Sequence, residues 1–352
     1  MQLNKSLLYA SIFALSSIFS STCVAAQSIE ALENLLNNGE HAQLLQTINT
    51  IPRSQYTEEH YMLHVFALAD DDLDDAEEMI DEAVKAFPQS AELHMNRASI
   101  MGAQASQSIF SALGYAEKAL DSLEIAASLE PNNPDTQYAL MMFHTNAPSI
   151  AGGDLGIALK QAQKVQALDP ERGTIAMYNY LRADDRKDEA LASILDAKSD
   201  FADSSSIQNV IASHYVREEA YDQAIAEYNV LTAMSLPSLV ENDEDSLETY
   251  ERALRRKLNA HYQLARLAKE SKSHIEMGIE HMEYFLAHVD QKHVKKNELP
   301  SVDWANMRLA ELYVLANNKT KASEAYARID ADSDKDLKKP LKKLKKALKK
   351  LS

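Results

Sequence analysis

The sequence predicts an all-α protein built as an array of helix pairs, and three observations lead to this fold class. Glycine and proline are scarce, at 8 and 9 of 352 residues, while 45% of the residues are hydrophobic and 25% are charged. This composition favours helices and argues against a Gly-rich nucleotide-binding fold or a β-sandwich. The other two observations are a spacing of small and bulky residues that recurs along the chain, and one helix hairpin in which that spacing is best preserved.

The recurring spacing consists of a small residue, a bulky residue four positions later and a third apolar position three further on. In several units a proline follows about five residues after that. Small residues let two helices approach closely, and a bulky residue fills the groove of the neighbouring helix. Proline then ends the unit, because it cannot continue a helix. The units begin at Ala76, Ala119, Ala158, Ala190, Ala224 and Ala322.

Residues 205–237 hold the best-preserved pair. Ile211 and Tyr215 lie on one helical stripe, and after a polar break Ala224 and Tyr228 lie on a second stripe. Apolar residues at these intervals face one side of an α-helix. Each helix of the pair therefore has an apolar face that needs further partners, and neighbouring units supply them in an array.

This unit resembles the tetratricopeptide repeat, a helix–turn–helix unit of about 34 residues. The resemblance covers residues 57–334, with a degenerate pair at 28–50, and is strongest at 205–237 and 303–334. It implies an all-α solenoid of about seven helix hairpins. The segment 101–170 is similar to a group of bacterial envelope proteins with such repeats. Two of the units are longer than 34 residues, with extra residues near 103–110 and 147–153.

The first 26 residues are typical of a secretory signal peptide. Lys5 precedes an apolar core at 7–19, and the small residues at 24–26 suit cleavage before Gln27. The three residues before Cys23 do not form a lipobox, so we expect cleavage after Ala26 rather than lipidation at Cys23. The mature chain then contains no cysteine, which excludes disulfides and thiol chemistry. Export, most specifically to a bacterial periplasm, is the expected localisation.

Charge is distributed unevenly along the chain. Residues 27–334 carry 52 acidic and 26 basic residues, whereas 335–352 carry nine lysines and one acidic residue. An acidic body argues against nucleic acid as the main partner, because neutralising phosphates requires a basic surface. We therefore divide the chain into the signal peptide (1–26), the repeat domain (27–334) and a basic tail (335–352).

The tail predicts a basic amphipathic helix that begins near Pro340, with leucines on one narrow stripe. Three hypotheses remain open: the leucines cap the last repeat, the helix binds an anionic membrane surface, or it docks on the acidic surface of its own body or of another copy, or on a polyanion. The candidate binding residues of this tail are Lys338, Lys339, Lys342, Lys343, Lys345, Lys346, Lys349 and Lys350.

No catalytic motif is present in the sequence. It contains no phosphate-binding loop, no GxSxG elbow, no HExxH and no Cys–His pair. The acidic run 70–75 lacks the glycine and the closing glutamate of a calcium loop, and we interpret it as a helix start. His60 and His64 could share a metal, but the repeat register places them in the core. The seven-residue spacing of His274, His281 and His288 is too wide for one ion. We expect no enzyme activity, no cofactor and no metal.

The resemblance implies a binding groove along the first helix of each unit, where such arrays hold peptides. Residues at the matching positions form an apolar lining early in the array, and a mixed basic and amide lining in its middle that is similar to a carboxylate clamp. The alternative is that these side chains are solvated or pair with the many acidic residues of the chain. The candidates are Tyr61, Met95, Tyr138, Met142, Arg172, Asn179, Arg182, Asn209 and Arg217.

Taken together, the patterns predict a non-enzymatic exported scaffold that binds an unknown protein or peptide partner in this groove. Assembly of an envelope complex is the expected setting. The alternative function is an adaptor tethered to a membrane or polyanion, with the basic tail as the main functional element. Nucleic acid is not an expected partner.

Overall fold

The computed structural model describes residues 28–69, 72–107 and 110–351. The predicted signal peptide and Cys23 lie outside these residues, as do Asp70 and Asp71 of the acidic run. Within the described part of the chain all regular elements are helical. The α-helices there are α1 (Ile29–Asn37), α2 (His41–Ile48), α3 (Glu58–Ala69), α4 (Leu73–Ala86), α5 (Ala91–Gln107), α6 (Ala112–Leu129), α7 (Pro134–Asn146), α8 (Leu155–Leu168), α9 (Pro170–Ala183), α10 (Lys187–Asp200), α11 (Ser205–Arg217), α12 (Tyr221–Ala233), α13 (Glu244–Ser271), α14 (Ile275–His288), α15 (Val302–Leu315), α16 (Lys319–Ala327) and α17 (Lys338–Leu348).

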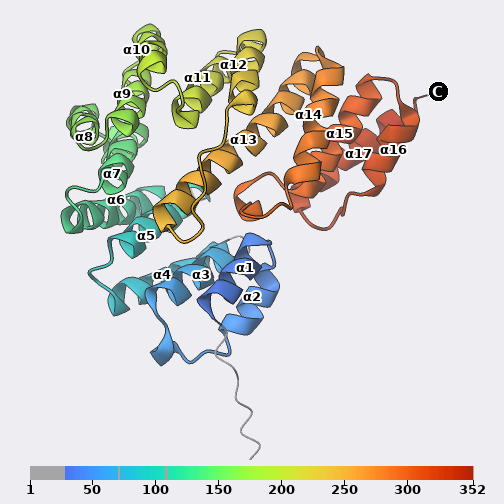
Figure 1. The fold of residues 1–352 in the computed structure, drawn as a ribbon. Coiled ribbons are helices and arrows are strands. Elements are labelled where there is room, and N and C mark those ends of the chain that lie inside the picture. Colours follow the sequence, from blue (N-terminus) through green and yellow to red (C-terminus); the bar gives the residue numbers. More distant parts are fainter. Residues whose placement is uncertain (1–27, 70–71, 108–109, 352) are drawn as a thin grey trace, which may run out of the picture.

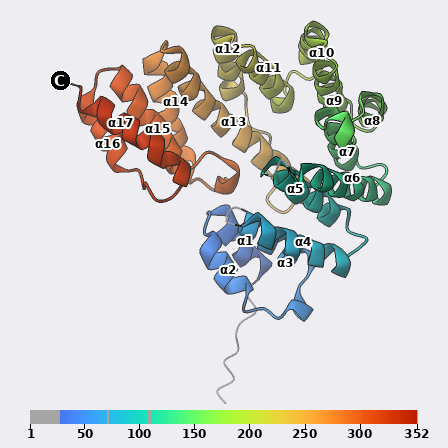
Figure 2. The ribbon, with the colours of Figure 1, turned by 180° about the vertical axis from the view of Figure 1, so that it is seen from behind.

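Four short 3₁₀ turns stand between these helices: η1 (Arg53–Gln55), η2 (Ser149–Ala151), η3 (Lys296–Glu298) and η4 (Lys335–Leu337). Consecutive α-helices pack together in pairs, from α1 with α2 to α15 with α16, and each pair also contacts the next pair along the chain. The pairs follow one another around a curved array, as Figure 1 and the reverse view in Figure 2 show. The predicted all-α solenoid is confirmed.

The described residues contain eight helix pairs, where the sequence predicted about seven. The additional pair is α13 with α14. Its second helix carries the same spacing at Gly278, Met282 and Phe285, which are all buried. A Cβ atom at Gly278 would lie 2.5 Å from the Cβ atom of Ala268, so only glycine fits this contact. The pair was missed because its small residue is glycine and because α13, with 28 residues, is twice the usual length.

The small residue of the repeated spacing is buried in every predicted unit. Such a residue allows the second helix of a pair to lie close to its neighbours. The exposed fraction of its side chain is 0% in five units and 3% in the sixth, at Ala76, Ala158, Ala190, Ala224 and Ala322, and at Ala119. The spacing in the sequence therefore identified the packed face of these helices correctly.

The apolar core is a row of four clusters rather than a single centre. The first runs from α1 to α7, the second from α7 to α11, the third from α11 to α13 and the last from α13 to α17. A solenoid is stabilised in this way, because each unit buries its apolar surface only against its neighbours.

The acidic run and the two long units have local explanations. Asp72 caps α4 by accepting hydrogen bonds from the backbone N–H groups of Asp74 and Asp75, at 2.9 and 3.2 Å. Of the extra residues near 103–110, residues 103–107 extend α5, and residues 108 and 109 lie outside the described residues. Those near 147–153 form η2 and a tight turn, in which a Cβ atom at Gly153 would lie 1.7 Å from the carbonyl oxygen of Ala147.

The tail folds into η4 and α17 and packs on the last helix pair. Leu337, Leu341 and Leu344 are buried at 0%, 6% and 3% exposure against the cluster of α13 to α16. Asp334, the residue before the tail, accepts a hydrogen bond of 2.7 Å from the indole nitrogen of Trp304 on α15. The helix begins at Lys338, two residues earlier than predicted, because proline is tolerated throughout the first helical turn.

The curvature of the array brings its N-terminal helix back to the connection between α14 and α15. α1 contacts η3, the turn that follows α14. Figures 1 and 2 both show the loop around η3 next to α1. Glu33 on α1 lies within the electrostatic field of Lys295 at this junction. The helix pairs between them therefore enclose an inner side.

Candidate functional site

The first helices of the middle pairs line the inner side of the curve. α7, α9, α11 and α13 lie inside, whereas α8, α10 and α12 lie outside (Figures 1 and 2). All nine groove residues predicted from the sequence lie on first helices: Tyr61 on α3, Met95 on α5, Tyr138 and Met142 on α7, Arg172, Asn179 and Arg182 on α9, and Asn209 and Arg217 on α11.

Tyr61 and Met95 contribute least to this surface. Tyr61 is 4% exposed and packs edge-to-face on Phe87. Its hydroxyl donates a hydrogen bond of 2.8 Å to Glu82, and burial together with this carboxylate raises the pKa of Tyr61 to about 12. Tyr61 therefore belongs to the N-terminal core. Met95 is half-buried and enters neither of the hydrogen-bonded clusters described next.

The first cluster is centred on Tyr138. The guanidinium carbon of Arg172 lies 4.9 Å from the centre of its ring, and Asn179 donates a hydrogen bond of 2.8 Å to its hydroxyl. Arg172 also forms an ion pair with Asp135. Burial raises the pKa of Tyr138, and Met142 packs into the same apolar cluster. The result is a half-buried aromatic surface held in place by α9.

The second cluster joins α9 to α11 through His214. The hydroxyl of Tyr178, which is fully buried, lies 3.0 Å from Nδ1 of His214. Arg217 donates to that hydroxyl at 2.7 Å, and Arg182 donates to Glu218 at 3.0 Å. Burial and the nearby Arg182 lower the pKa of His214, so its neutral imidazole accepts a hydrogen bond from the hydroxyl of Tyr178. The repeat pattern of the sequence did not predict Tyr178 and His214 as site residues, because tertiary contacts bring them together.

The arginines predicted for the groove thus already have partners within the chain. Arg172 pairs with Asp135 and Arg182 pairs with Glu218. Asn209 differs, because its half-buried side chain forms no hydrogen bond with the described residues.

Arg256 on α13 was not predicted from the sequence and is the least compensated cation of this region. It donates a hydrogen bond of 3.2 Å to the hydroxyl of Ser205, the first residue of α11. No carboxylate of the described residues lies within ion-pair distance of its guanidinium. Burial, with a contribution from the positive Arg255 and Arg252, lowers the pKa of Arg256 to about 10, and the more distant Glu171 compensates its charge only in part. The sequence of α13 predicts a helix but does not indicate that one of its side chains reaches α11.

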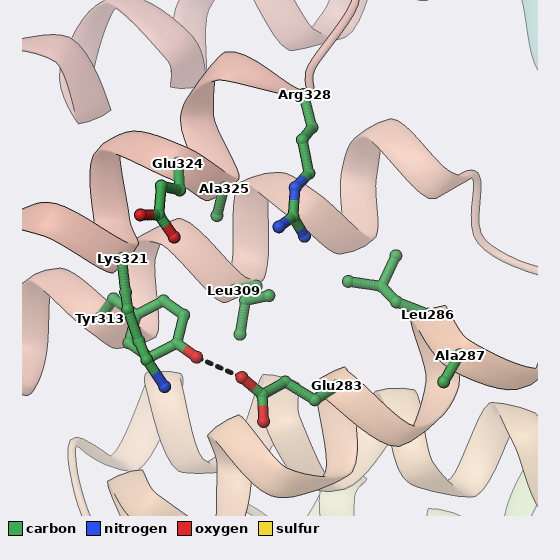
Figure 3. A pocket seen from close by; sticks show the side chains of 9 residues that line it. All are labelled: Glu283, Leu286, Ala287, Leu309, Tyr313, Lys321, Glu324, Ala325 and Arg328. Carbon is green, nitrogen blue, oxygen red and sulfur yellow. Dashed lines mark hydrogen bonds between the residues drawn. The ribbon is translucent and has the colours of Figure 1, made fainter.

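A pocket of about 340 Å³ lies elsewhere, between α14, α15 and α16 (Figure 3). Tyr313 donates a hydrogen bond to Glu283, and the ammonium of Lys321 lies 5.2 Å from the centre of the Tyr313 ring. Figure 3 shows Arg328 pointing into the same space, above Leu309. Both signs of charge line this pocket, so it has no clear preference for a cation or an anion. None of the predicted groove residues is part of it.

The histidines form pairs and stacks with neighbouring rings. His261 on α13 lies with its Nδ1 2.8 Å from Nδ1 of His281, and the ring of Tyr284 stacks on His261 and on His288 with centroids 3.9 Å apart in each case. His64 is buried, with its Nδ1 3.1 Å from the hydroxyl of Tyr56. In the part of the chain that the structure describes, no group of three or more His, Cys, Asp or Glu side chains is placed to hold a metal ion.

Acidification should destabilise the protein through His261. Burial, together with the nearby His281, lowers the pKa of His261 to about 3, whereas an imidazole in the unfolded chain titrates near pH 6.5. Between these values the unfolded chain binds more protons, so the free energy of unfolding decreases as the pH falls. Between pH 6.5 and 5.0 the free energy of unfolding, measured by urea unfolding and circular dichroism, should fall by about 1.6 kcal/mol less in His261→Gln than in the wild type.

The matched control for this experiment is His274→Asn. The His274 side chain is 52% exposed, and asparagine tolerates its φ of +55°. This variant should keep the pH dependence of the wild type. If the free energy of unfolding depends on pH equally in the wild type and in His261→Gln, the lowered pKa of His261 would be contradicted.

Solved structures of tetratricopeptide repeat proteins are similar to this chain. The crystal structure of yeast Tom70 matches 96% of this chain and 66% of its own, at 16% sequence identity and a TM-score of 0.58. A tetratricopeptide repeat protein from Parabacteroides merdae matches 77% of this chain and 95% of its own, at 14% identity and a TM-score of 0.43. The tetratricopeptide domain of P58(IPK) matches 91% of this chain and 78% of its own, at 15% identity and a TM-score of 0.31. No protein-family model matches the sequence, and no curated protein is similar to it.

The fold is therefore a solenoid of tetratricopeptide-like helix pairs, as the sequence spacing predicted, and this chain spans about two thirds of the Tom70 structure. Solenoids of this class have an extended concave side. Among the described residues, no helix is long and apolar enough to cross a membrane.

Proposed function

We propose that this protein is an exported, non-enzymatic scaffold that binds a segment of a partner protein along the inner side of its array. The observation that carries the proposal is Arg256, a half-buried cation with a lowered pKa and a single neutral hydrogen-bond partner, Ser205. A buried charge is unfavourable unless it is paired. A carboxylate of a bound segment would supply the missing charge and form a charge-assisted hydrogen bond.

The neighbouring groups suit the rest of such a segment. Tyr138 and Met142 offer half-buried apolar surface for a side chain. The amide of Asn209 has no partner within the described chain and can bind the backbone of an extended peptide. The partner that we propose is therefore a peptide with at least one acidic group and one apolar side chain, bound as such arrays bind extended chains. The signal peptide predicted from the sequence would place this interaction in the bacterial envelope, where the scaffold would help to assemble or maintain a complex.

Crosslinking and pull-down from an envelope extract test the groove. The variants are Arg256→Gln and Tyr138→Ala, and the matched control is Arg186→Gln, which removes an exposed arginine paired with Glu189 on a turn. We expect Arg256→Gln to reduce recovery of the specific partner by about tenfold, equivalent to one charge-assisted hydrogen bond. Its melting temperature should stay at or above that of the wild type, because an unpaired charge is removed. Equal recovery in the wild type and both groove variants would reject the groove.

The second candidate function is an adaptor tethered through its basic tail. One specific observation favours it: all eight predicted tail lysines are exposed. Because α17 also packs on α15 and α16, removing residues 335–352 would disturb the array itself. Substitution of the lysines alone separates the two functions better than a deletion does. Under the groove proposal such variants keep their partner, and under the adaptor proposal they lose their attachment.

A further inference from the structure

The lysines of α17, with Lys349 and Lys350 directly after it, form a basic surface that the rest of the chain leaves uncompensated; this set is called the lysine surface of α17. The eight side chains, from Lys338 to Lys350, are all exposed. Within the described residues only Lys338 has an ion-pair partner, Asp332 at 3.4 Å. An acidic protein that leaves seven neighbouring lysines unpaired has a surface ready for an external anion.

The geometry of the helix directs these lysines away from the body. At 100° per residue they cover an arc of about 160°, and the leucines cover an arc of about 80° on the opposite side. Leu337, Leu341 and Leu344 are already buried against the last helix pairs. The apolar face is therefore not available for insertion into lipid, and attraction by charge is the remaining mode of binding.

The place of α17 in the array also suits a flat anionic partner. It packs on α15 and α16 at the C-terminal end of the array, which Figure 1 shows in red. Residues 27–334 carry twice as many acidic as basic residues. An approach through α17 keeps most of these acidic groups farther from the partner than the Debye length of about 8 Å at physiological salt, so their repulsion is screened.

We propose that the lysine surface of α17 binds the anionic headgroups of a phospholipid bilayer and holds the array by its C-terminal end, while the leucines stay packed. This inference rests on the tethered-adaptor candidate and does not depend on the groove. A bilayer is favoured over a soluble polyanion because the lysines cover a broad convex arc around the helix and extend about 18 Å along its axis. This shape matches an extended flat surface.

Sedimentation with lipid vesicles tests this directly with the full mature chain. The vesicles contain 30% phosphatidylglycerol in phosphatidylethanolamine, or phosphatidylcholine alone, at 50 and 500 mM NaCl. We expect pelleting only with the anionic vesicles and only at low salt. The variant Lys342→Gln/Lys343→Gln/Lys346→Gln/Lys349→Gln should bind at least tenfold more weakly, with an unchanged melting temperature.

The matched control removes the same number of charges from exposed lysines of the body: Lys85→Gln/Lys160→Gln/Lys164→Gln/Lys187→Gln. It should pellet like the wild type. A Leu344→Ala variant separates charge from insertion, since it should melt earlier yet still bind vesicles at a temperature where it is folded. Loss of binding in the folded Leu344→Ala variant, or binding that survives 500 mM NaCl, would mean that leucines insert and would overturn the proposal.

Two further results would also overturn it. One is the absence of pelleting with anionic vesicles at 50 mM NaCl. The other is binding to polyphosphate or duplex DNA without binding to vesicles, which would assign the surface to a soluble polyanion. None of these outcomes affects partner recovery by the groove, because that experiment depends on Arg256 and is measured without lipid.

Discussion

Replacing Gly173 by alanine is expected to destabilise the protein by about 3 kcal/mol, at the upper end of the cost of overpacking. Gly173 lies in the first turn of α9, against α8. An added Cβ atom would lie 2.1 Å from Cα of Gln166 and 2.6 Å from its backbone nitrogen. Because the obstacle is backbone rather than the end of a side chain, the two helices must move apart. Thermal unfolding should show a melting temperature lower by roughly 5 °C.

The matched control is Gly102→Ala, within α5. A Cβ atom at Gly102 would have no neighbour within 4 Å. Alanine is also the better helix former by about 1 kcal/mol, so this variant should be neutral or slightly more stable. If Gly173→Ala and Gly102→Ala have the same melting temperature, the close approach of α8 and α9 would be incorrect.

The second large effect is expected for Leu344→Asp. Leu344 is 3% exposed between α17 and the last helix pair. The change removes a buried leucine side chain and places a carboxylate in its position, at a cost of about 4 kcal/mol. We expect α17 to detach and to expose the apolar surface that it covers. A lower melting temperature and concentration-dependent association in light scattering should both follow, because uncovered ends of solenoids associate.

Lys345→Asp is the control, since it introduces the same carboxylate one residue later at an exposed position. Its melting temperature should stay close to that of the wild type, and it should remain monodisperse to the same degree. An equal loss of stability in both variants would show that the attachment of the tail to the array depends on its charge rather than on packing of its leucines.

Local sequence signals were sufficient for the repeated part of the structure. The fully buried Ala158, Ala162 and Val165 show why: each recurs at a spacing that places it on one face of a helix, and that face must be covered. The same logic identified the leucine stripe of the tail, where Leu337, Leu341 and Leu344 are packed. It failed for the α13–α14 pair, where a glycine takes the place of the usual alanine and the first helix is twice as long.

The groove was only partly accessible from the sequence. Repeat positions placed Tyr138, Arg172 and Asn179 on first helices, and the structure brings these three together. They could not show that Arg172 and Arg182 are held by acidic residues of neighbouring units. They also could not show that Arg256 reaches Ser205, 51 residues away along the chain. A repeat pattern gives the register of a side chain within its own unit, whereas its partners depend on the rotation between units.

The sequence by itself determined the helix pairs, their packed faces, the leucine and lysine faces of the tail and the contrast of charge between tail and body. Each of these follows from the period of the α-helix and from counting residues. Only the tertiary structure decided the contact of α1 with η3, the burial of Tyr61, the cluster around His214 and the isolation of Arg256. The physical reason is that the curvature of a solenoid is the sum of small rotations between many successive units. The sequence of one unit does not determine that sum.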